Sequence, residues 1–285
     1  MPRQETPGIQ VNDVTTPAGI MTAADLARFP SPPADHVIPY GDDPLQFGEL
    51  RLPDGDGPFP LIVLVHGGVW LAEYDLAHVR KLAQGFATAG IATWTIEYRR
   101  VGNPGGGWPG TFEDVAAAGD FVVELARRFP LDPGRVITAG HSAGGHLALW
   151  FADRPGEMRQ RDSIRPRGVL ALAPAPDLEY LQATGAYDRV VDRLMGGSPR
   201  EFPERYAAGS GMRRIPVSTP QVVIVGRYDT FWRPIGLRYV EAALAAGAPL
   251  ELIDAPESGH FELIDPDASD WRLVLDAARR LLGVA

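Results

Sequence analysis

The sequence predicts an α/β fold, in which a mostly parallel sheet carries helices on both faces. Short apolar runs alternate with longer amphipathic stretches from about residue 60 to the end of the chain. One run, Leu61–Val65, is apolar at every position, as expected of a central strand that is covered on both faces. Another, Val136–Ala139, leads through a glycine-flanked turn directly into a helical stretch. This alternation is typical of parallel strands that are joined by crossover helices.

The expected elements divide the chain into an N-terminal arm, residues 1–35, and an α/β domain, residues 36–285. The arm holds one short helical stretch before a proline-rich segment, and we expect it to form part of a lid. The expected strands are 36–40, 45–52, 61–65, 91–98, 136–139, 168–173, 221–226 and 249–255. The expected helices are 78–89, 112–129, 234–246 and 269–282. Residues 178–215, which contain short helical pieces, interrupt the alternation and predict a lid insertion.

Composition excludes several classes of function. The formal net charge of −9 and the lack of a long basic run argue against nucleic acid or an anionic membrane as a partner. The sequence has no cysteine, so it has neither disulfides nor thiolate metal ligands. It has neither an apolar leader nor an apolar run of about 18 residues. We therefore expect a cytoplasmic protein with a small-molecule partner, and the sequence leaves a homodimer open.

The turn after the strand at 136–139 carries a Gly-x-Ser-x-Gly motif with Ser142 at its apex. A serine hydroxyl is a poor nucleophile unless it is exposed, activated by a base and placed beside oxyanion donors. A sharp strand-to-helix turn supplies the exposure, and Gly140 and Gly144 let the backbone approach closely. The motif predicts that Ser142 is a nucleophile.

Two further strands end in groups that such a serine needs. Asp229 follows the strand 221–226, and His260 follows the strand 249–255. The carboxyl ends of parallel strands meet at one edge of a sheet, and the order Ser, Asp, His is that of nucleophile-elbow hydrolases. We expect His260 to take the serine proton and Asp229 to orient the imidazole. Asp177, after the strand 168–173, is the alternative acid.

The expected oxyanion donors are backbone N–H groups of Gly68, Val69 and Ala143. The first two belong to the loop His66–Trp70, which follows a central strand, and Ala143 directly follows the nucleophile. His66, His141 and His146 are interpreted as structural residues that brace the site. We expect the substrate pocket to be lined by three aromatic residues near these loops, namely Trp70, Phe231 and Trp232.

The motifs together resemble those of the α/β-hydrolase superfamily. His-Gly-Gly-x-Trp at 66–70, Gly-His-Ser-Ala-Gly-Gly at 140–145, Asp229 and His260 look like small esterases and lipases of the carboxylesterase type. The first motif is also similar to that of the kynurenine formamidase branch. The chain has Val69 at the position where hormone-sensitive lipases have a third glycine. Formamidases usually have an aromatic residue at that position.

The resemblance implies an α/β-hydrolase fold and a serine hydrolase that needs neither metal nor organic cofactor. The expected substrates are small acyl or aryl carboxylic esters, cleaved through an acyl-serine. Hydrolysis of an arylformamide such as N-formylkynurenine is the alternative activity. A third alternative, from a different class, is a ligand receptor that keeps the hydrolase fold without catalysis.

Overall fold

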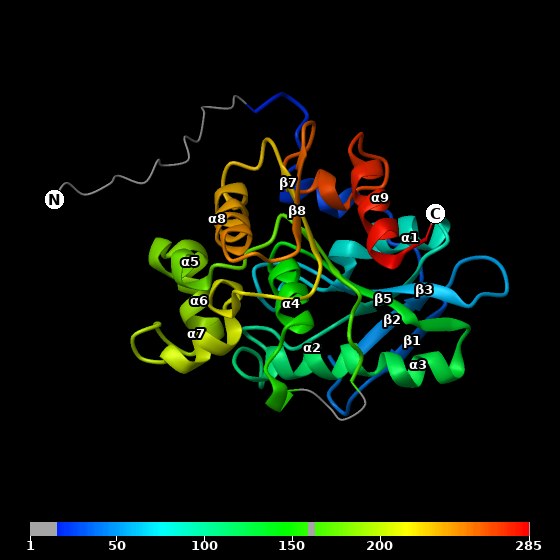
Figure 1. Ribbon diagram of the computed structural model, residues 1–285, viewed down its shortest axis with the longest axis horizontal. Helices are drawn as coiled ribbons and strands as arrows, with labels where there is room; N and C mark the ends of the chain where they lie inside the picture. Colours follow the sequence, from blue (N-terminus) through cyan, green and yellow to red (C-terminus); the bar gives the residue numbers. More distant parts are fainter. Residues whose placement is uncertain (1–15, 159–162, 285) are drawn as a thin grey trace.

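The computed structural model describes residues 16–158 and 163–284, and these residues form one eight-stranded sheet in the order β1-β2-β4-β3-β5-β6-β7-β8 (Figure 1). Residues 1–15 of the expected arm lie outside the described residues. The strands are β1 (His36–Pro39), β2 (Phe47–Arg51), β3 (Phe59–Val65), β4 (Ala92–Ile96), β5 (Leu131–His141), β6 (Val169–Leu172), β7 (Gln221–Gly226) and β8 (Leu250–Ala255). The first two strands pair antiparallel, as β1 with β2 and β2 with β4, and every later pairing is parallel. The predicted mostly parallel sheet is therefore confirmed.

Helices cover both faces of the sheet, as predicted. They are α1 (Arg80–Thr88), α2 (Gly110–Asp120), α3 (Val122–Arg128), α4 (Ala143–Ala152), α5 (Leu178–Thr184), α6 (Ala186–Met195), α7 (Pro203–Gly209), α8 (Trp232–Ala245) and α9 (Trp271–Leu282). Successive side chains of a strand point to opposite faces. Accordingly Leu61 and Val63 of β3 pack in the core beneath α2, α4 and α8, whereas Ile62 and Leu64 pack beneath α1 and α9.

Two elements differ from their predicted bounds. The strand before Ser142 begins at Leu131 rather than near Val136, because Leu131 pairs with Phe59 of β3, and a register shift separates this pairing from that of Val136 with Leu61. The expected helix 112–129 is two helices, α2 and α3, which meet at Phe121. Phe121 has φ −62° and ψ −15°, and its N–H donates to the Ala117 carbonyl at 2.9 Å, so a single residue separates the two helices. Neither change moves the carboxyl ends of the strands.

The segment 178–215 lies between β6 and β7 and contains α5, α6, α7 and the 3₁₀ helix η4 (Gly211–Arg214). These helices group together beside α4 in Figure 1. The His146 Nε2–H of α4 donates to the Gly209 carbonyl at 2.7 Å, and the Trp150 Nε1–H donates to the Ala208 carbonyl at 3.0 Å. The helix after the Ser142 turn therefore anchors the end of α7. A role of this segment as a lid stays a prediction.

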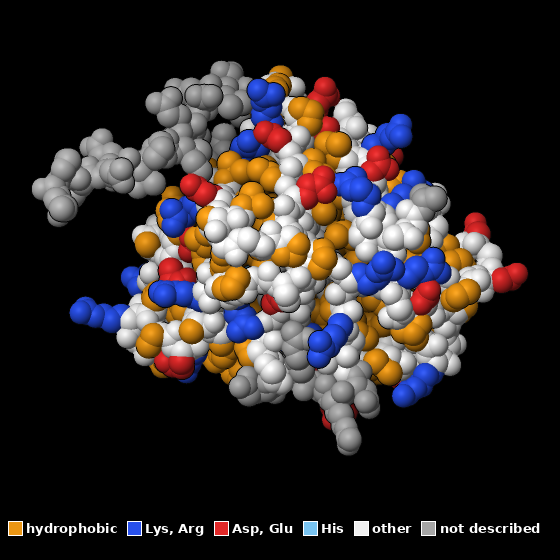
Figure 2. Space-filling view, in the orientation of Figure 1, with side chains coloured by type: hydrophobic (Ala, Val, Ile, Leu, Met, Phe, Trp, Pro, Cys, Tyr) orange, Lys and Arg blue, Asp and Glu red, His pale blue; other side chains and the backbone are white. Residues whose placement is uncertain are grey.

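On the face seen in Figure 2, basic and acidic side chains are interspersed rather than gathered by sign. None of the helices in the described part of the chain is long and apolar enough to cross a bilayer.

Candidate active site

Ser142 stands at a strained turn between β5 and α4. Its backbone has φ 56° and ψ −119°, a region that non-glycine residues rarely adopt and that is found where function requires it. A β-carbon at Gly144 would lie 2.1 Å from the Val65 carbonyl oxygen, and one at Gly140 would lie 2.2 Å from the Gly144 oxygen. Only glycine fits at either position. The local sequence thus forces the sharp strand-to-helix turn that the motif predicted.

Asp229 and His260 meet at the ends of β7 and β8. The His260 Nδ1–H donates to Asp229 Oδ2 at 2.6 Å, and Asp229 Oδ1 accepts the Trp232 N–H at 2.9 Å. The two loops are joined through the backbone, since the Tyr228 N–H donates to the Ser258 carbonyl at 2.9 Å. Asp229 is buried, so its bond to the imidazole is shielded from water. Its carboxylate fixes the ring orientation, and Nε2 of His260 makes no hydrogen bond that the structure records within residues 16–158 and 163–284.

The ring of His260 lies beside the Ser142 turn. Its centroid is 4.4 Å from that of His141, the residue that directly precedes Ser142. The structure thus brings Ser142, Asp229 and His260 to one edge of the sheet, as expected from the order of the strands.

Asp177, the alternative acid, has other partners. Its carboxylate caps the start of α5, where Oδ1 accepts the Tyr180 N–H at 3.0 Å. Oδ2 accepts the Arg238 Nε–H at 3.1 Å. Both oxygens of Asp177 therefore serve the contact between α5 and α8, whereas Asp229 bonds to the imidazole.

The loop after β3 lies against the Ser142 turn. A β-carbon at Gly67 would lie 2.8 Å from the His141 oxygen and 3.2 Å from the Ser142 β-carbon. Gly68, Val69 and Trp70 have φ of 103°, 45° and 58°, so two non-glycine residues occupy the left-handed region. Within the described part of the chain, no hydrogen bond occupies the N–H groups of Gly68, Val69 and Ala143. These groups are available for an oxyanion.

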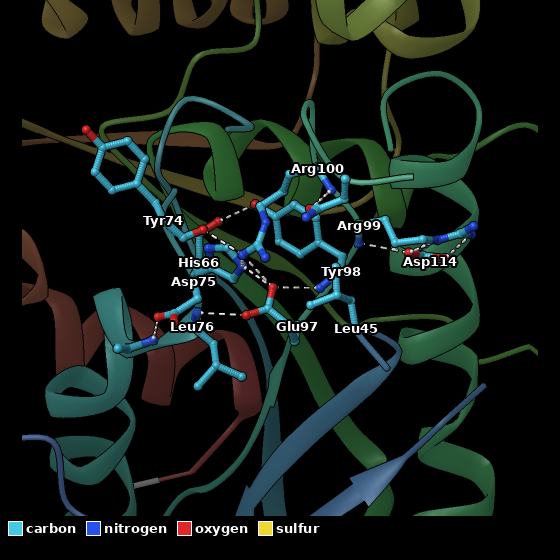
Figure 3. Close-up of polar contacts among 12 residues, drawn as sticks. Leu45, His66, Tyr74, Asp75, Leu76, Glu97, Tyr98, Arg99, Arg100 and Asp114 are labelled. Atoms are coloured by element: carbon cyan, nitrogen blue, oxygen red, sulfur yellow. Dashed lines mark hydrogen bonds and ion pairs between the residues drawn. The ribbon is translucent and has the colours of Figure 1, made fainter. Parts of the chain in front are cut away.

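A buried ionic network supports this loop (Figure 3). Glu97 Oε1 lies 3.0 Å from His66 Nε2 and 2.6 Å from Arg100 Nη1, and Oε2 accepts the Leu76 N–H at 3.1 Å. Burial raises the pKa of Glu97, but the charge and hydrogen bond of His66, the charge of Arg100 and the hydrogen bond from the Tyr98 N–H bring it below its ordinary value. The Tyr98 hydroxyl donates to the His66 carbonyl at 2.8 Å, and its ring stacks on the imidazole. His66 thus braces the loop, in agreement with the structural role predicted for it from the sequence.

Removing the Glu97 carboxylate is expected to destabilise the protein strongly. Glu97→Ala leaves Arg100, only 2 % exposed, without its ionic partner, and the loss of one partner of a buried pair costs about 3–5 kcal/mol. Urea unfolding measures this cost as a fall in the free energy of unfolding. The control is Glu241→Ala on the exposed side of α8, where a change within about 0.5 kcal/mol is expected. Equal, small effects of both substitutions would contradict the bracing role.

A second chain of hydrogen bonds holds His260 through its backbone. The His141 Nε2–H donates to the His260 carbonyl at 2.9 Å, so His141 Nδ1 is the acceptor of the His78 Nε2–H at 2.8 Å. Burial, followed by the neighbouring His66 and His260, lowers the pKa of His78 to about 3. Burial also lowers the pKa of His141 well below its ordinary value. Both rings are therefore neutral near pH 7, as this donor–acceptor pattern requires. The sequence offered no signal for His78.

The three predicted pocket residues differ in position. The ring of Trp70 is fully buried and packs edge-on to His146, and its place in the pocket wall stays a prediction. Trp232 stacks on the His260 ring at 5.6 Å, and Phe231 is 43 % exposed beside it. Tyr187 of the insertion stacks on Trp232 at 5.6 Å.

Tyr187 reaches this position through an unusual backbone. Tyr187, Asp188 and Arg189 are consecutive left-handed residues with φ of 51°, 52° and 52°. Each such non-glycine residue costs roughly 1–2 kcal/mol. No residue pattern in the sequence announces such a turn, and this explains why the contact was missed.

A mostly parallel sheet with a serine turn, an Asp–His pair and a donor loop at one edge defines an α/β hydrolase. Residues 49–231 match the family model BD-FAE, and the chain belongs to that family.

Known relatives and solved structures agree with this class. The chain is 33 % identical to a probable isoprenylcysteine alpha-carbonyl methylesterase of Arabidopsis thaliana, over 84 % of this chain and 53 % of the relative. It is 27 % identical to esterase LipI of Mycobacterium tuberculosis, over 70 % of this chain and 65 % of that protein. The chain thus spans between half and two thirds of the length of these relatives. Its fold is similar to esterase B from Lactobacillus rhamnosis, with a TM-score of 0.75 at 20 % identity, over 92 % of this chain and 91 % of that one.

Proposed function

We propose that the protein is a serine hydrolase that cleaves small acyl or aryl carboxylic esters. The observation that carries the proposal is the 2.6 Å contact between Asp229 Oδ2 and His260 Nδ1, in a ring whose centroid lies 4.4 Å from that of His141, the residue before the strained Ser142 turn. The relatives named as esterases support the same chemistry. The proposal keeps the small-molecule substrate and cytoplasmic location expected from the sequence, and it leaves a homodimer open.

The proposed reaction has two halves. Ser142 Oγ bonds to the substrate carbonyl carbon while its proton passes to His260 Nε2, and Asp229 stabilises the imidazolium. The oxyanion is held by the backbone N–H groups of Gly68, Val69 and Ala143. The intermediate collapses, and the leaving alkoxide takes the proton from His260. Water then attacks the acyl-serine by the same route and releases the acid.

The aromatic residues around His260 support a short or planar substrate. Tyr187 and Phe231 are 47 % and 43 % exposed, and Trp232 lies between Tyr187 and the imidazole. Tyr74 packs on Gly68 of the donor loop and is 38 % exposed. Four aromatic side chains thus flank the region between the donor loop and the histidine. Flat rings pack well against such side chains.

A substrate panel tests the proposal. Wild type and Ser142→Ala are assayed on p-nitrophenyl esters from acetate to dodecanoate, on phenyl acetate and on N-formylkynurenine. We expect the highest kcat/KM for short or aryl esters, and no turnover by the variant. Rates that rise with chain length to dodecanoate would contradict the small-substrate proposal. Faster turnover of the formamide would establish the arylformamidase alternative, and binding without turnover would establish the receptor alternative.

A further inference from the structure

We propose that the N-terminal arm helps to position His260, and that Glu262 is the positioning residue through which it acts. This inference rests on the proposed function, in which His260 is the general base. The described part of the arm, residues 16–35, carries a 3₁₀ helix, η1 (Ala23–Arg28). The segment that carries His260 continues into the 3₁₀ helix η5 (Glu262–Ile264).

Glu262 joins two segments that lie 241 residues apart in the chain. Its Oε1 accepts the Met21 N–H of the arm. Its Oε2 accepts the N–H of Gly259, the neighbour of His260, at 2.9 Å. The Glu262 side chain is nearly buried, and no arginine or lysine of the described ranges forms an ion pair with it. Two backbone N–H groups therefore satisfy a buried carboxylate, which ties the arm to the residue beside the base.

The arm also fills space against the same loop. A β-carbon at Gly259 would lie 2.6 Å from Cγ2 of Ile20, so the arm packs directly on the backbone next to His260. Thr22 and Asp25 fix the start of η1, where Asp25 Oδ2 accepts the Thr22 N–H at 2.9 Å and the Thr22 hydroxyl at 2.8 Å. Ile20 and Met21 therefore precede an ordered helical turn.

A second attachment lies at the end of the arm. The Nζ of Lys81, the only lysine in the sequence, lies 4.5 Å from the centroid of the Phe29 ring. The same ammonium pairs with Asp265 and, at 2.9 Å, with Asp267, both shortly after Glu262. The arm is thus attached to the His260 segment both at Glu262 and through Lys81.

Other bonds hold the His260 loop without the arm. The His141 Nε2–H donates to the His260 carbonyl at 2.9 Å, and Asp270 Oδ2 accepts the Ser258 hydroxyl at 2.8 Å. Loss of the Glu262 contact is therefore expected to loosen the base rather than unfold the domain. Misplacement of a catalytic group by about 1 Å can cost on the order of 100-fold in rate. A partial loosening predicts a loss of about 10-fold in kcat with KM little changed.

The test removes each side of the contact in the full chain. Met21→Pro deletes the N–H that Glu262 accepts, and Glu262→Ala deletes the acceptor. The control is Ala23→Pro at the first position of η1, where proline is tolerated and where no recorded bond uses the N–H. A second control, Glu257→Ala, removes an exposed glutamate of the same loop.

We expect kcat to fall about 10-fold in Met21→Pro and in Glu262→Ala, with KM unchanged and faster amide exchange in residues 256–264. The double variant is expected to lose no more than Glu262→Ala alone, because Glu262→Ala already removes the contact that Met21→Pro breaks. Glu262→Gln, which keeps one acceptor oxygen, is expected to retain intermediate activity.

Wild-type kcat in Met21→Pro, or additive losses in the double variant, would overturn the inference. If Glu262→Ala does not fold, the inference is tested by comparing kcat and amide exchange of Met21→Pro with those of Ala23→Pro. An inactive wild type would instead refute the proposed function.

Discussion

Replacing Ser142 with alanine is expected to lower kcat for ester hydrolysis by about 10⁵-fold or more, because loss of the nucleophile removes the acyl-enzyme route entirely. The fold should survive, since the strained turn is imposed by Gly140 and Gly144 rather than by the hydroxyl. Steady-state hydrolysis of phenyl acetate measures the loss. The residual rate would come from the oxyanion donors and from substrate binding.

Ser269→Ala is the matched control for this substitution. Ser269 is exposed, and no recorded hydrogen bond involves its hydroxyl within the described ranges. We expect wild-type kcat and KM for this variant. A Ser142→Ala protein that is folded and still hydrolyses phenyl acetate at more than about one hundredth of the wild-type rate would show that another residue attacks the ester.

Asp229→Asn is expected to lower kcat about 10⁴-fold while KM changes little. An amide at this position can donate to Nδ1 of His260, which favours the tautomer whose Nε2 carries a proton and cannot accept one from serine. The 2.6 Å contact between Asp229 Oδ2 and His260 Nδ1 makes this tautomer switch a direct consequence of the substitution. Initial rates on phenyl acetate for the folded variant measure the effect.

Asp177→Asn provides the comparison for the acid. Its carboxylate caps α5 and pairs with Arg238, which is itself 45 % exposed. Asparagine caps a helix about as well as aspartate, and an ion pair whose arginine is half-exposed is screened by solvent and contributes about 1 kcal/mol. We therefore expect kcat within about twofold of wild type. A large loss in Asp177→Asn with normal activity in Asp229→Asn would reverse the assignment of the acid.

The strand-end residues of the site followed from local sequence patterns. The strand predicted at 221–226 has the bounds of β7, Gln221–Gly226, and the carboxyl ends of β5, β7 and β8 lie at one edge of the sheet. Parallel pairing makes this geometry a consequence of topology, so the sequence alone places together three residues that are far apart in the chain.

Residues that reach the site through packing were not predictable in this way. Trp70 is fully buried, and both Val69 and Trp70 adopt the left-handed region, which non-glycine residues seldom do and which their residue types do not predict. Tyr187 likewise depends on a left-handed turn without glycine. The contact of Met21 with Glu262 joins distant segments through a backbone N–H, which carries no side-chain signal. Tertiary contacts decided these positions.

The most direct test of the acyl-serine is covalent trapping with diethyl p-nitrophenyl phosphate, followed by mass spectrometry. The reagent forms a stable phosphoryl ester with an activated serine and releases p-nitrophenol. The account predicts one p-nitrophenol per chain, one diethylphosphoryl group on the peptide that contains Ser142, and no reaction in Ser142→Ala. A folded wild-type protein that releases no p-nitrophenol, or that carries the adduct on another residue, would contradict it.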